Sequence, residues 1–565
     1  MNMRFVTCGL VLSAAMIGCS KGASDSANSG TPTETDVPSD TDTDTDTDTD
    51  TDTDTDTDTD TDTDTDTDTT ETGAKTLCDT VGVTVTMHGL YTATAVFEID
   101  LPVGAADASL SIEAEGWVER YAVEGEDERV TLTRPLVPEV VHEWTLNLTV
   151  DEMDCELSDV VEPPAWDKSW DLPIFESSLS AKEARHDRLL FPGYIGSEPH
   201  IFLLDERGRV MWLHRFDASF DPDIPTRQAM MAADGSGVWL HGQDDAFLPY
   251  IEDLPMDVVK LGWDGTELAR YTVWNGHHDW AMDPLETVVE SLGREELASI
   301  EGHCGFSPVY GDTLFAIDMT TGARTDLYAT TGDGFPFLAG CKDVEPFLTY
   351  TYLNAYDRLG DTRSMSAGGL IHAFIVGAAD GTWWHFTNFA NSDLPLTYDG
   401  VNLYASLLEA PHNLECTEGI DWGFRTPLDK DAIVCLGFNR RAKSETWDCD
   451  TVDLFVIDRT AGELSYRAAF PSTVDKVSRG AGCEETRSHG NVTLLGPPNP
   501  AGDGVTRAAM FDAGDAVITV MTVEGDDGGN ADIDYDYSIV PYETRGWFIS
   551  GYPSIGQDAV VEWVK

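Results

Sequence analysis

The sequence predicts an all-β protein: an N-terminal β-sandwich of the immunoglobulin or fibronectin kind, followed by a six-bladed β-propeller. Two observations predict this fold. A strand–turn–strand phrase occurs six times in the second part of the chain, and the stretch before it alternates apolar and polar residues over about 85 positions. An apolar leader and a long polar tract precede both regions.

The repeated phrase consists of an apolar strand, an Asp, up to three residues, a Gly and a second strand. Asp bonds nearby backbone groups at a turn and Gly adopts positive φ there, so each phrase has the form of a β-hairpin. The turn aspartates are Asp205, Asp264, Asp318, Asp380, Asp458 and Asp512. Their spacing of roughly 55 to 80 residues is typical of propeller blades with long loops. Six phrases therefore predict six blades within residues 186–565.

Residues 76–165 contain the alternating runs that predict the sandwich, including VGVTVTMHG, ASLSIEAEGW and EWTLNLTVDE. A period of two is that of half-buried strands in an antiparallel sheet. We expect Trp117 and Trp144 in its core, and a disulfide between Cys78 and Cys155 that joins its first and last strands. Beyond the sandwich, only the stretch 284–299 has enough helical periodicity to form a short helix.

Residues 1–19 have the layout of an export signal, with Arg4 and an apolar run that is too short to span a membrane. The sequence Met-Ile-Gly-Cys at its end resembles a bacterial lipobox, which predicts a lipidated Cys19. The alternative is an ordinary signal peptide with an incidental cysteine. By resemblance to lipoprotein sorting, Ser20 favours the outer membrane, facing either the periplasm or the cell surface.

Residues 20–75 form a linker dominated by strict Thr-Asp alternation from Thr41 to Asp68. Its carboxylates repel one another and nothing apolar can be buried, so we expect a disordered, extended tether. Calcium binding is the alternative, although the tract lacks the glycine turn of a ligand cage.

The chain of 565 residues carries a formal net charge of −68. Such acidity makes nucleic acid a poor partner. An even number of cysteines in an exported protein predicts up to four disulfides. The candidates are Cys78, Cys155, Cys304, Cys341, Cys416, Cys435, Cys449 and Cys483.

Three histidine-containing segments could carry chemistry. They are His277-His278-Asp279 after the second phrase, His412 before the fifth, and His489 before the sixth. Histidines from separate blades could supply a nucleophile with acid or base support, or a metal site. The alternative for each is ordinary packing in the core or on the surface.

The order of elements and four phrases resemble the bacterial arylsulfate sulfotransferases. The phrases are GYIGSEPHIFLLDERGRVMWLHR, GHHDWAMDPLETVVE, PHNLECTEGIDWGF, and SHGNVTLLGPPNPAGDG with YDYSIVPY. The resemblance implies a six-bladed propeller behind a small sandwich. It also implies sulfuryl transfer between phenols through a sulfated histidine, with an aryl sulfate and a phenol acceptor as substrates and with no cofactor or metal.

Carried over by position, the resemblance makes His412 the nucleophile, with Asn413 where the family has Asp. The family's His-His-Asp phrase falls on His277, His278 and Asp279, with His278 the residue expected to face the channel. Tyr352 takes the place of a third family histidine. The family's arginine falls near Ala367, and Arg363 could serve if the loop is shortened.

These departures leave two functions open. One is an arylsulfotransferase-like enzyme of the bacterial cell envelope. The other is a surface-tethered propeller that binds a ligand or partner without catalysis. In either case the sequence predicts contact with the membrane through the lipid anchor alone.

Overall fold

The structure is a computed structural model, and the chain divides into residues 1–67 and residues 68–565. The residues described are 78–123, 129–167, 172, 174–179, 188–195, 198–215, 226–242, 255–296, 310–330, 353–368, 372–378, 380–387, 396–398, 401–402, 413–418, 432–439, 451–458, 463–471, 490–495, 505–512, 517–525, 531–541, 554–556 and 562–563. The predictions for the export signal, Cys19 and the tether lie outside them.

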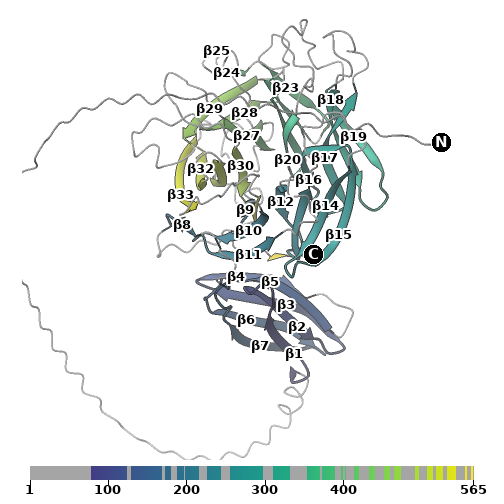
Figure 1. Cartoon of the computed structure of the whole chain (residues 1–565), viewed down its shortest axis with the longest axis vertical. Coiled ribbons are helices and arrows are strands. Elements are labelled where there is room, and N and C mark those ends of the chain that lie inside the picture. Colours follow the sequence, from purple (N-terminus) through teal and green to yellow (C-terminus); the bar gives the residue numbers. More distant parts are fainter. Residues whose placement is uncertain are drawn as a thin grey trace, which may run out of the picture. The chain divides into compact units, whose positions relative to one another are not determined.

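A β-sandwich is built from the first seven strands (Figure 1). They are β1 (Gly82–Met87), β2 (Thr94–Asp100), β3 (Ala105–Ala114), β4 (Trp117–Ala122), β5 (Arg129–Pro135), β6 (His142–Val150) and β7 (Met153–Val161). One sheet has the order β1-β2-β5 and the other the order β4-β3-β6-β7. The fourth strand thus pairs with the third, whereas constant-type immunoglobulin domains place it beside the fifth.

Side chains of the sandwich alternate between core and solvent as the sequence predicts. In β6, His142, Trp144, Leu146 and the two next alternate residues are buried, and the residues between them are more exposed. The predicted disulfide joins Cys78, just before β1, to Cys155 in β7.

The remaining sheets are the six blades of the propeller (Figure 1). Blade 1 contains β34 (Ser554–Gly556), β9 (Arg188–Ile195), β10 (Glu198–Asp205) and β11 (Val210–Arg215); blade 2 contains β12 (Thr226–Met231), β13 (Gly237–Gly242), β14 (Pro255–Gly262) and β15 (Glu267–Trp274); blade 3 contains β16 (Gly276–Met282), β17 (Val288–Glu296), β18 (Tyr310–Asp318) and β19 (Arg324–Ala329).

The other three blades follow in chain order. Blade 4 contains β20 (Leu353–Leu359), β21 (Thr362–Gly368), β22 (His372–Gly377) and β23 (Trp383–Thr387); blade 5 contains β26 (Asn413–Glu418), β27 (Ala432–Asn439), β28 (Thr451–Asp458) and β29 (Glu463–Pro471), with β24 (Leu396–Tyr398) and β25 (Val401–Asn402) beside β29; blade 6 contains β30 (Gly490–Leu495), β31 (Val505–Asp512), β32 (Val517–Gly525), β33 (Ala531–Pro541) and β8 (Phe175–Ser177).

One strand from each blade takes part in a closed ring of contacts. Strand β12 contacts β16, β16 contacts β20, β20 contacts β26, β26 contacts β30, β30 contacts β34, and β34 contacts β12. Strand β34 comes from the C-terminal end of the chain and completes blade 1, whose other strands lie within residues 188–215. This ring confirms the predicted six-bladed propeller.

The turn chemistry of the phrases is also confirmed where it is described. The turn carboxylates accept backbone N–H groups: Asp205 from Arg209 at 2.7 Å, Asp264 from Thr266 at 3.0 Å, Asp318 from Thr320 at 2.9 Å and Asp380 from Thr382 at 2.9 Å. The turn glycines have positive φ: Gly208 79°, Gly265 77°, Gly322 71° and Gly381 81°.

The structure departs from the sequence predictions in three places. In blade 6 the phrase hairpin is β31–β32, and β33 and β8 extend the sheet beyond it. Strand β8 lies between residues 165 and 186, outside the bounds predicted for the sandwich and for the propeller. The expected helix over 284–299 is wrong, since Val288–Glu296 forms β17.

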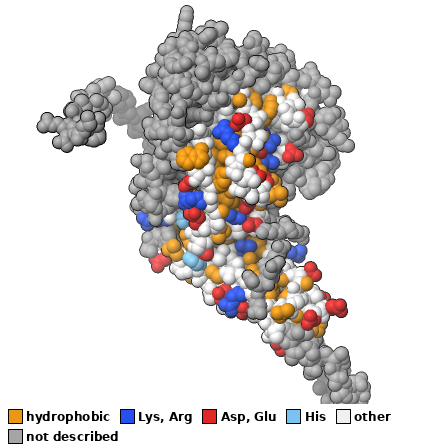
Figure 2. All heavy atoms as spheres, turned by 90° about the vertical axis from the view of Figure 1, so that its right-hand side faces the viewer, with side chains coloured by type: hydrophobic (Ala, Val, Ile, Leu, Met, Phe, Trp, Pro, Cys, Tyr) orange, Lys and Arg blue, Asp and Glu red, His pale blue; other side chains and the backbone are white. Residues whose placement is uncertain are grey.

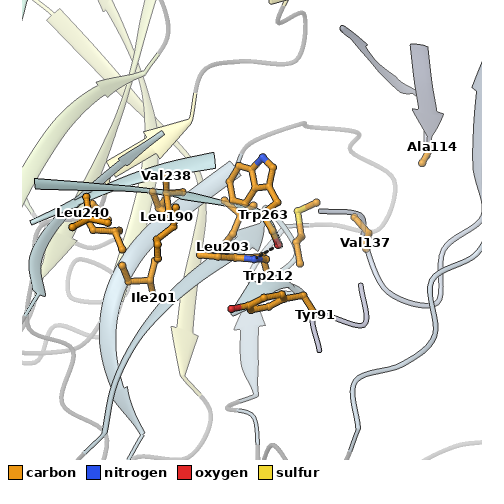
Figure 3. Packing of buried hydrophobic residues seen from close by; sticks show 14 of the residues in the cluster. Tyr91, Ala114, Val137, Leu190, Ile201, Leu203, Trp212, Val238, Leu240 and Trp263 are labelled. Atoms are coloured by element: carbon orange, nitrogen blue, oxygen red, sulfur yellow. Dashed lines mark hydrogen bonds between the residues drawn. The ribbon is translucent and has the colours of Figure 1, made fainter. Parts of the chain in front are cut away.

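The sandwich and the first two blades share a hydrophobic core. Tyr91 and Trp117 of the sandwich belong to the same buried cluster as Trp212 and Trp263 of the propeller. Figure 3 shows Trp212 between Tyr91 and Trp263, with its indole N–H bonded to the Trp263 carbonyl at 2.9 Å. A buried ion pair between Arg188 and Glu119 adds a polar link across the same contact.

The C-terminal end of the chain returns to the sandwich. Strand β35 (Glu562–Trp563) pairs in parallel with β4, so it covers the edge of the four-stranded sheet. The sandwich is therefore held by blades 1 and 2 and by strand β35.

Candidate functional site

The strands of each blade define two faces of the propeller. Four antiparallel strands return the chain to the face where the blade began, so successive innermost strands start on one face. We call the face where β12, β16, β20 and β26 begin the start face. The opposite face, which carries the hairpin turns of the first five phrases, is the turn face; the turn of the sixth phrase, between β31 and β32, lies on the start face.

Strand β16 begins with a bulge that contains the predicted His277, His278 and Asp279. Gly276 pairs with Gly293 and Trp280 pairs with Ser291, so three residues of β16 lie opposite the single residue between those partners. Bulges interrupt the regular alternation of a strand and re-aim side chains, and they are frequent beside active sites. The structure places the backbone of this segment at the start face, and its side chains are not described.

The bulge is held by close backbone packing on both strands. A Cβ atom on Gly276 would lie 2.9 Å from Met256 Sδ, and one on Gly293 would lie 2.4 Å from Phe315 Cε1. Asn275, just before the bulge, adopts φ +63°. Trp280, just after it, is fully buried. Packing therefore fixes both ends of the histidine segment.

The next two innermost strands begin directly after the other predicted residues. Tyr352 precedes Leu353, the first residue of β20, and His412 precedes Asn413, the first residue of β26. Tyr352 and His412 themselves lie outside the described residues. Strand β20 also has a register shift at Asn354, near its start.

Arg363 lies at the turn face instead. Ala367, four residues later on β21, pairs with Leu353 at the start face. At about 3.3 Å per residue, Arg363 is about 13 Å from that position. The structure therefore does not bring Arg363 to the histidine segment.

The Arg363 guanidinium is part of a buried ion cluster. Its Nε and Nη2 donate to the two carboxylate oxygens of Glu290 at 2.9 and 2.7 Å, and Arg358 Nη1 donates at 3.0 Å. The hydroxyl of Tyr356 donates to the same carboxylate. Burial alone would raise the pKa of Glu290, but the bonds from Arg363 and Tyr356 and the charges of Arg363 and Arg358 lower it overall.

One arginine that sequence reasoning missed does lie at the start face. Thr226 pairs with Gly242 and Gln228 with His241, which leaves Arg227 as an extra residue near the start of β12. Strand β12 contacts β16, the strand of the histidine bulge. No strand–turn–strand phrase surrounds Arg227, so nothing in the sequence marked it as a site residue.

His489 directly precedes Gly490, which pairs with Asp512, the turn aspartate of the sixth phrase. This pairing joins the start of an innermost strand to the end of its neighbour, as Thr226 and Gly242 do in blade 2, so β30 also starts at the start face. The start of β30 therefore lies on the same face as those of β16, β20 and β26, and His489 itself lies outside the described residues.

A second disulfide lies beside the site. Cys416 and Cys435 are direct partners across β26 and β27, and their sulfur atoms are bonded. It ties the strand that follows His412 to its neighbour. Cys304, Cys341, Cys449 and Cys483 lie outside the described residues.

Charged groups on the described surface are largely interspersed, as Figure 2 shows for one face. Arg270, for example, is bonded to Asp257 and Glu267. In the part of the chain that the structure describes, no three His, Cys, Asp or Glu residues are grouped to hold a metal ion. No helix within that part is long and apolar enough to cross a membrane.

Comparisons with known proteins give structural likenesses only. No protein-family model and no curated protein matches the sequence. Among solved structures, a quinoprotein alcohol dehydrogenase-like protein from Bacteroides thetaiotaomicron is 8% identical, with 81% of this chain and 94% of that chain covered and a TM-score of 0.25.

An oligogalacturonate lyase in complex with manganese is 8% identical, with coverage of 82% and 97% and a TM-score of 0.27. The N-terminal domain of Nup159 is 10% identical, with coverage of 67% and 96% and a TM-score of 0.26. Likenesses at this level carry no argument about chemistry, so the function has to be argued from the site itself.

Proposed function

We propose that the chain is an arylsulfotransferase-like enzyme that moves a sulfuryl group from an aryl sulfate to a phenol through His412. One observation supports it above the others. The starts of β16, β20 and β26 are neighbours on one face of the propeller, and these are the strands next to the predicted His278, Tyr352 and His412. Residues from several blades that meet on one face are the usual way a propeller builds a site.

The proposed reaction has two steps. A ring nitrogen of His412 attacks the sulfur atom; an N–S bond forms, the S–O bond to the first phenol breaks, and the leaving phenolate takes a proton from Tyr352. The oxygen of the acceptor phenol then attacks the same sulfur, the N–S bond breaks, and the acceptor's proton passes to His278 and from there to the Tyr352 phenolate, which restores the starting protonation of both residues.

Negative charge on the sulfuryl oxygens calls for a nearby cation. Arg363 is paired with Glu290 at the turn face, so we assign this role to Arg227 on the strength of its position at the start of β12. This assignment replaces a residue of the family's pattern with one from a different blade.

A non-catalytic binding propeller is the second candidate, and two observations favour it. Arg363, the sequence's substitute for the family arginine, is engaged in the ion cluster of Glu290. The net charge of −68 also repels anionic aryl sulfates at long range.

In both candidates we propose a bacterial outer-membrane lipoprotein, anchored through Cys19 and held off the membrane by residues 20–75.

The deciding experiment incubates the protein lacking residues 1–75 with 4-nitrophenyl sulfate, with and without a phenol acceptor. We expect acceptor-dependent release of nitrophenolate, and a loss of at least about a hundredfold in His412→Ala. His88→Ala, in the sandwich, is the matched control and should retain full activity. If the folded wild-type protein releases no nitrophenolate, the enzyme proposal is wrong and the binding function stands.

A further inference from the structure

Asp312 is a buried carboxylate at the start-face end of blade 3. It is fully buried and lies on β18 opposite Arg294 of β17. The adjacent row of the sheet runs from Gly276 through Gly293 to Thr313. Asp312 is therefore level with the beginning of the histidine bulge, two strands away from it.

The carboxylate of Asp312 reaches the next blade. Its Oδ2 accepts the backbone N–H of Leu353 at 2.9 Å. Leu353 is the first residue of β20, and its amide belongs to the peptide bond that joins it to Tyr352. A hydrogen bond from a backbone amide to a carboxylate is stronger than one between neutral groups, more so without competing water.

Blade 3 also holds Asp312 itself in place. Thr330, just beyond β19, donates its backbone N–H to the Asp312 carbonyl at 3.0 Å. The Thr330 hydroxyl accepts the Asp312 N–H at 3.0 Å and donates to its carbonyl at 2.9 Å. A residue fixed at its backbone in this way can transmit the position of blade 3 to the first peptide of blade 4.

We propose that Asp312 is a positioning residue that fixes the start of β20 relative to the histidine bulge of β16. This inference rests on the proposed function, because it concerns the spacing between His278 and Tyr352. The register shift at Asn354 interrupts regular pairing at this end of β20. The hydrogen bond from Asp312, in the neighbouring blade, therefore fixes backbone that strand pairing holds less well. A displacement of about 1 Å in a reacting group can lower the rate about a hundredfold.

The test compares two substitutions of Asp312, one that keeps a hydrogen-bond acceptor and one that removes it. Asp312→Asn keeps a side-chain oxygen for the Leu353 amide, and Asp312→Leu has a similar shape without an acceptor. We expect kcat for sulfuryl transfer to fall about 10- to 100-fold in Asp312→Leu with little change in KM, and less than about threefold in Asp312→Asn. Asp326→Asn, on the exposed face of β19, should match the wild type.

Hydrogen exchange of the peptide that contains Leu353 gives a readout independent of activity. Exchange should be faster in Asp312→Leu than in the wild type, and close to the wild type in Asp312→Asn. Thr330→Val, which removes the hydroxyl that holds Asp312, should shift exchange and kcat in the same direction by less. It keeps the test decisive if Asp312→Leu does not fold.

Unchanged exchange and kcat in folded Asp312→Leu would overturn the proposal. So would an equal loss of kcat in Asp312→Asn and Asp312→Leu, because the charge and not the hydrogen bond would then be what matters. A wild-type protein without transfer activity would remove the proposed function, yet the exchange data would still decide whether Asp312 holds the start of β20.

Discussion

The two ends of strand β20 differ in structure: one lies in a buried ion cluster, and the other has irregular backbone pairing. At the turn face, Tyr356 and Arg358 bond to Glu290, together with Arg363 from the next strand, and the charges there neutralise one another. At the start face, the strand has a shifted register at Asn354 and a backbone bond to another blade. Saturated polar clusters stabilise a fold, whereas irregular backbone held by its surroundings is where binding and catalysis are usually found.

This difference explains why Arg363 does not serve as a site residue, although its position in the sequence is close to that of the family's arginine. The Arg363 side chain is 18% exposed and the Glu290 side chain 3% exposed, so this pair is largely removed from water. Moving Arg363 toward a substrate would leave a buried carboxylate with fewer partners, which is costly. The turn face should therefore govern stability and the start face activity.

The largest effect on stability is expected from Glu290→Leu. It leaves two guanidinium groups and the Tyr356 hydroxyl without their shared acceptor, and breaking a buried ion pair on one side costs about 3–5 kcal/mol. Urea unfolding of the variant should show this loss. Glu267→Gln, which breaks an exposed ion pair with Arg270, is the control and should change little.

The pKa of Glu290 is lowered in the folded protein, so the stability that this carboxylate contributes is complete at pH values above the ordinary carboxyl range. That stability is lost as the pH falls through the lowered pKa.

Folded Glu290→Leu should keep its sulfuryl-transfer rate, because the cluster lies at the turn face. A transfer rate that fell further than the folded fraction would contradict the separation of the two faces.

A second effect concerns His142 in the sandwich. Its Nδ1–H donates to the Val140 carbonyl at 2.8 Å and its Nε2 accepts the Val137 N–H at 3.3 Å, so the neutral ring uses both nitrogens. Burial lowers the pKa of His142 to about 4. The unfolded chain then binds a proton that the folded chain does not, and stability falls as the pH drops from about 6.5 to about 4.

The loss attributable to His142 should reach about 3 kcal/mol at the acid end of this range. Urea unfolding of the wild type and of His142→Gln at several pH values measures it as the difference between the two curves. Parallel curves between pH 4 and pH 7 would show that His142 does not remain neutral in the folded sandwich. Transfer activity at neutral pH should be the same in both proteins.

Local chemistry could be predicted from the sequence, and long-range pairing could not. The hairpins at Asp205 and Asp264 follow from a turn residue and a glycine a few positions apart. The histidine bulge depends on Gly293, which lies on the neighbouring strand. The position of Arg363 at the turn face depends on which residues of β20 and β21 pair with each other. The segment 284–299 matches a helical period, but its residues Val288–Glu296 pair with β18 as a strand of blade 3.

The smallest effect on stability is expected from Gly293→Ala. This substitution should lower the transfer rate, because Gly293 lies beside the histidine bulge at the start face. The added Cβ would meet Phe315 Cε1 at 2.4 Å and the Asn275 carbonyl oxygen at 3.1 Å, so the backbone before the bulge has to shift. Crowding of this kind typically costs about 1–3 kcal/mol. Because Gly293 pairs with Gly276 at the beginning of the bulge, the transfer rate of the folded variant should fall more than that of Glu290→Leu, although it loses less stability. Gly89→Ala, where no atom lies within 4 Å of the new Cβ, should leave both quantities unchanged. Measured side by side, a Gly293→Ala protein with full activity and a Glu290→Leu protein without it would reverse the roles of the two faces.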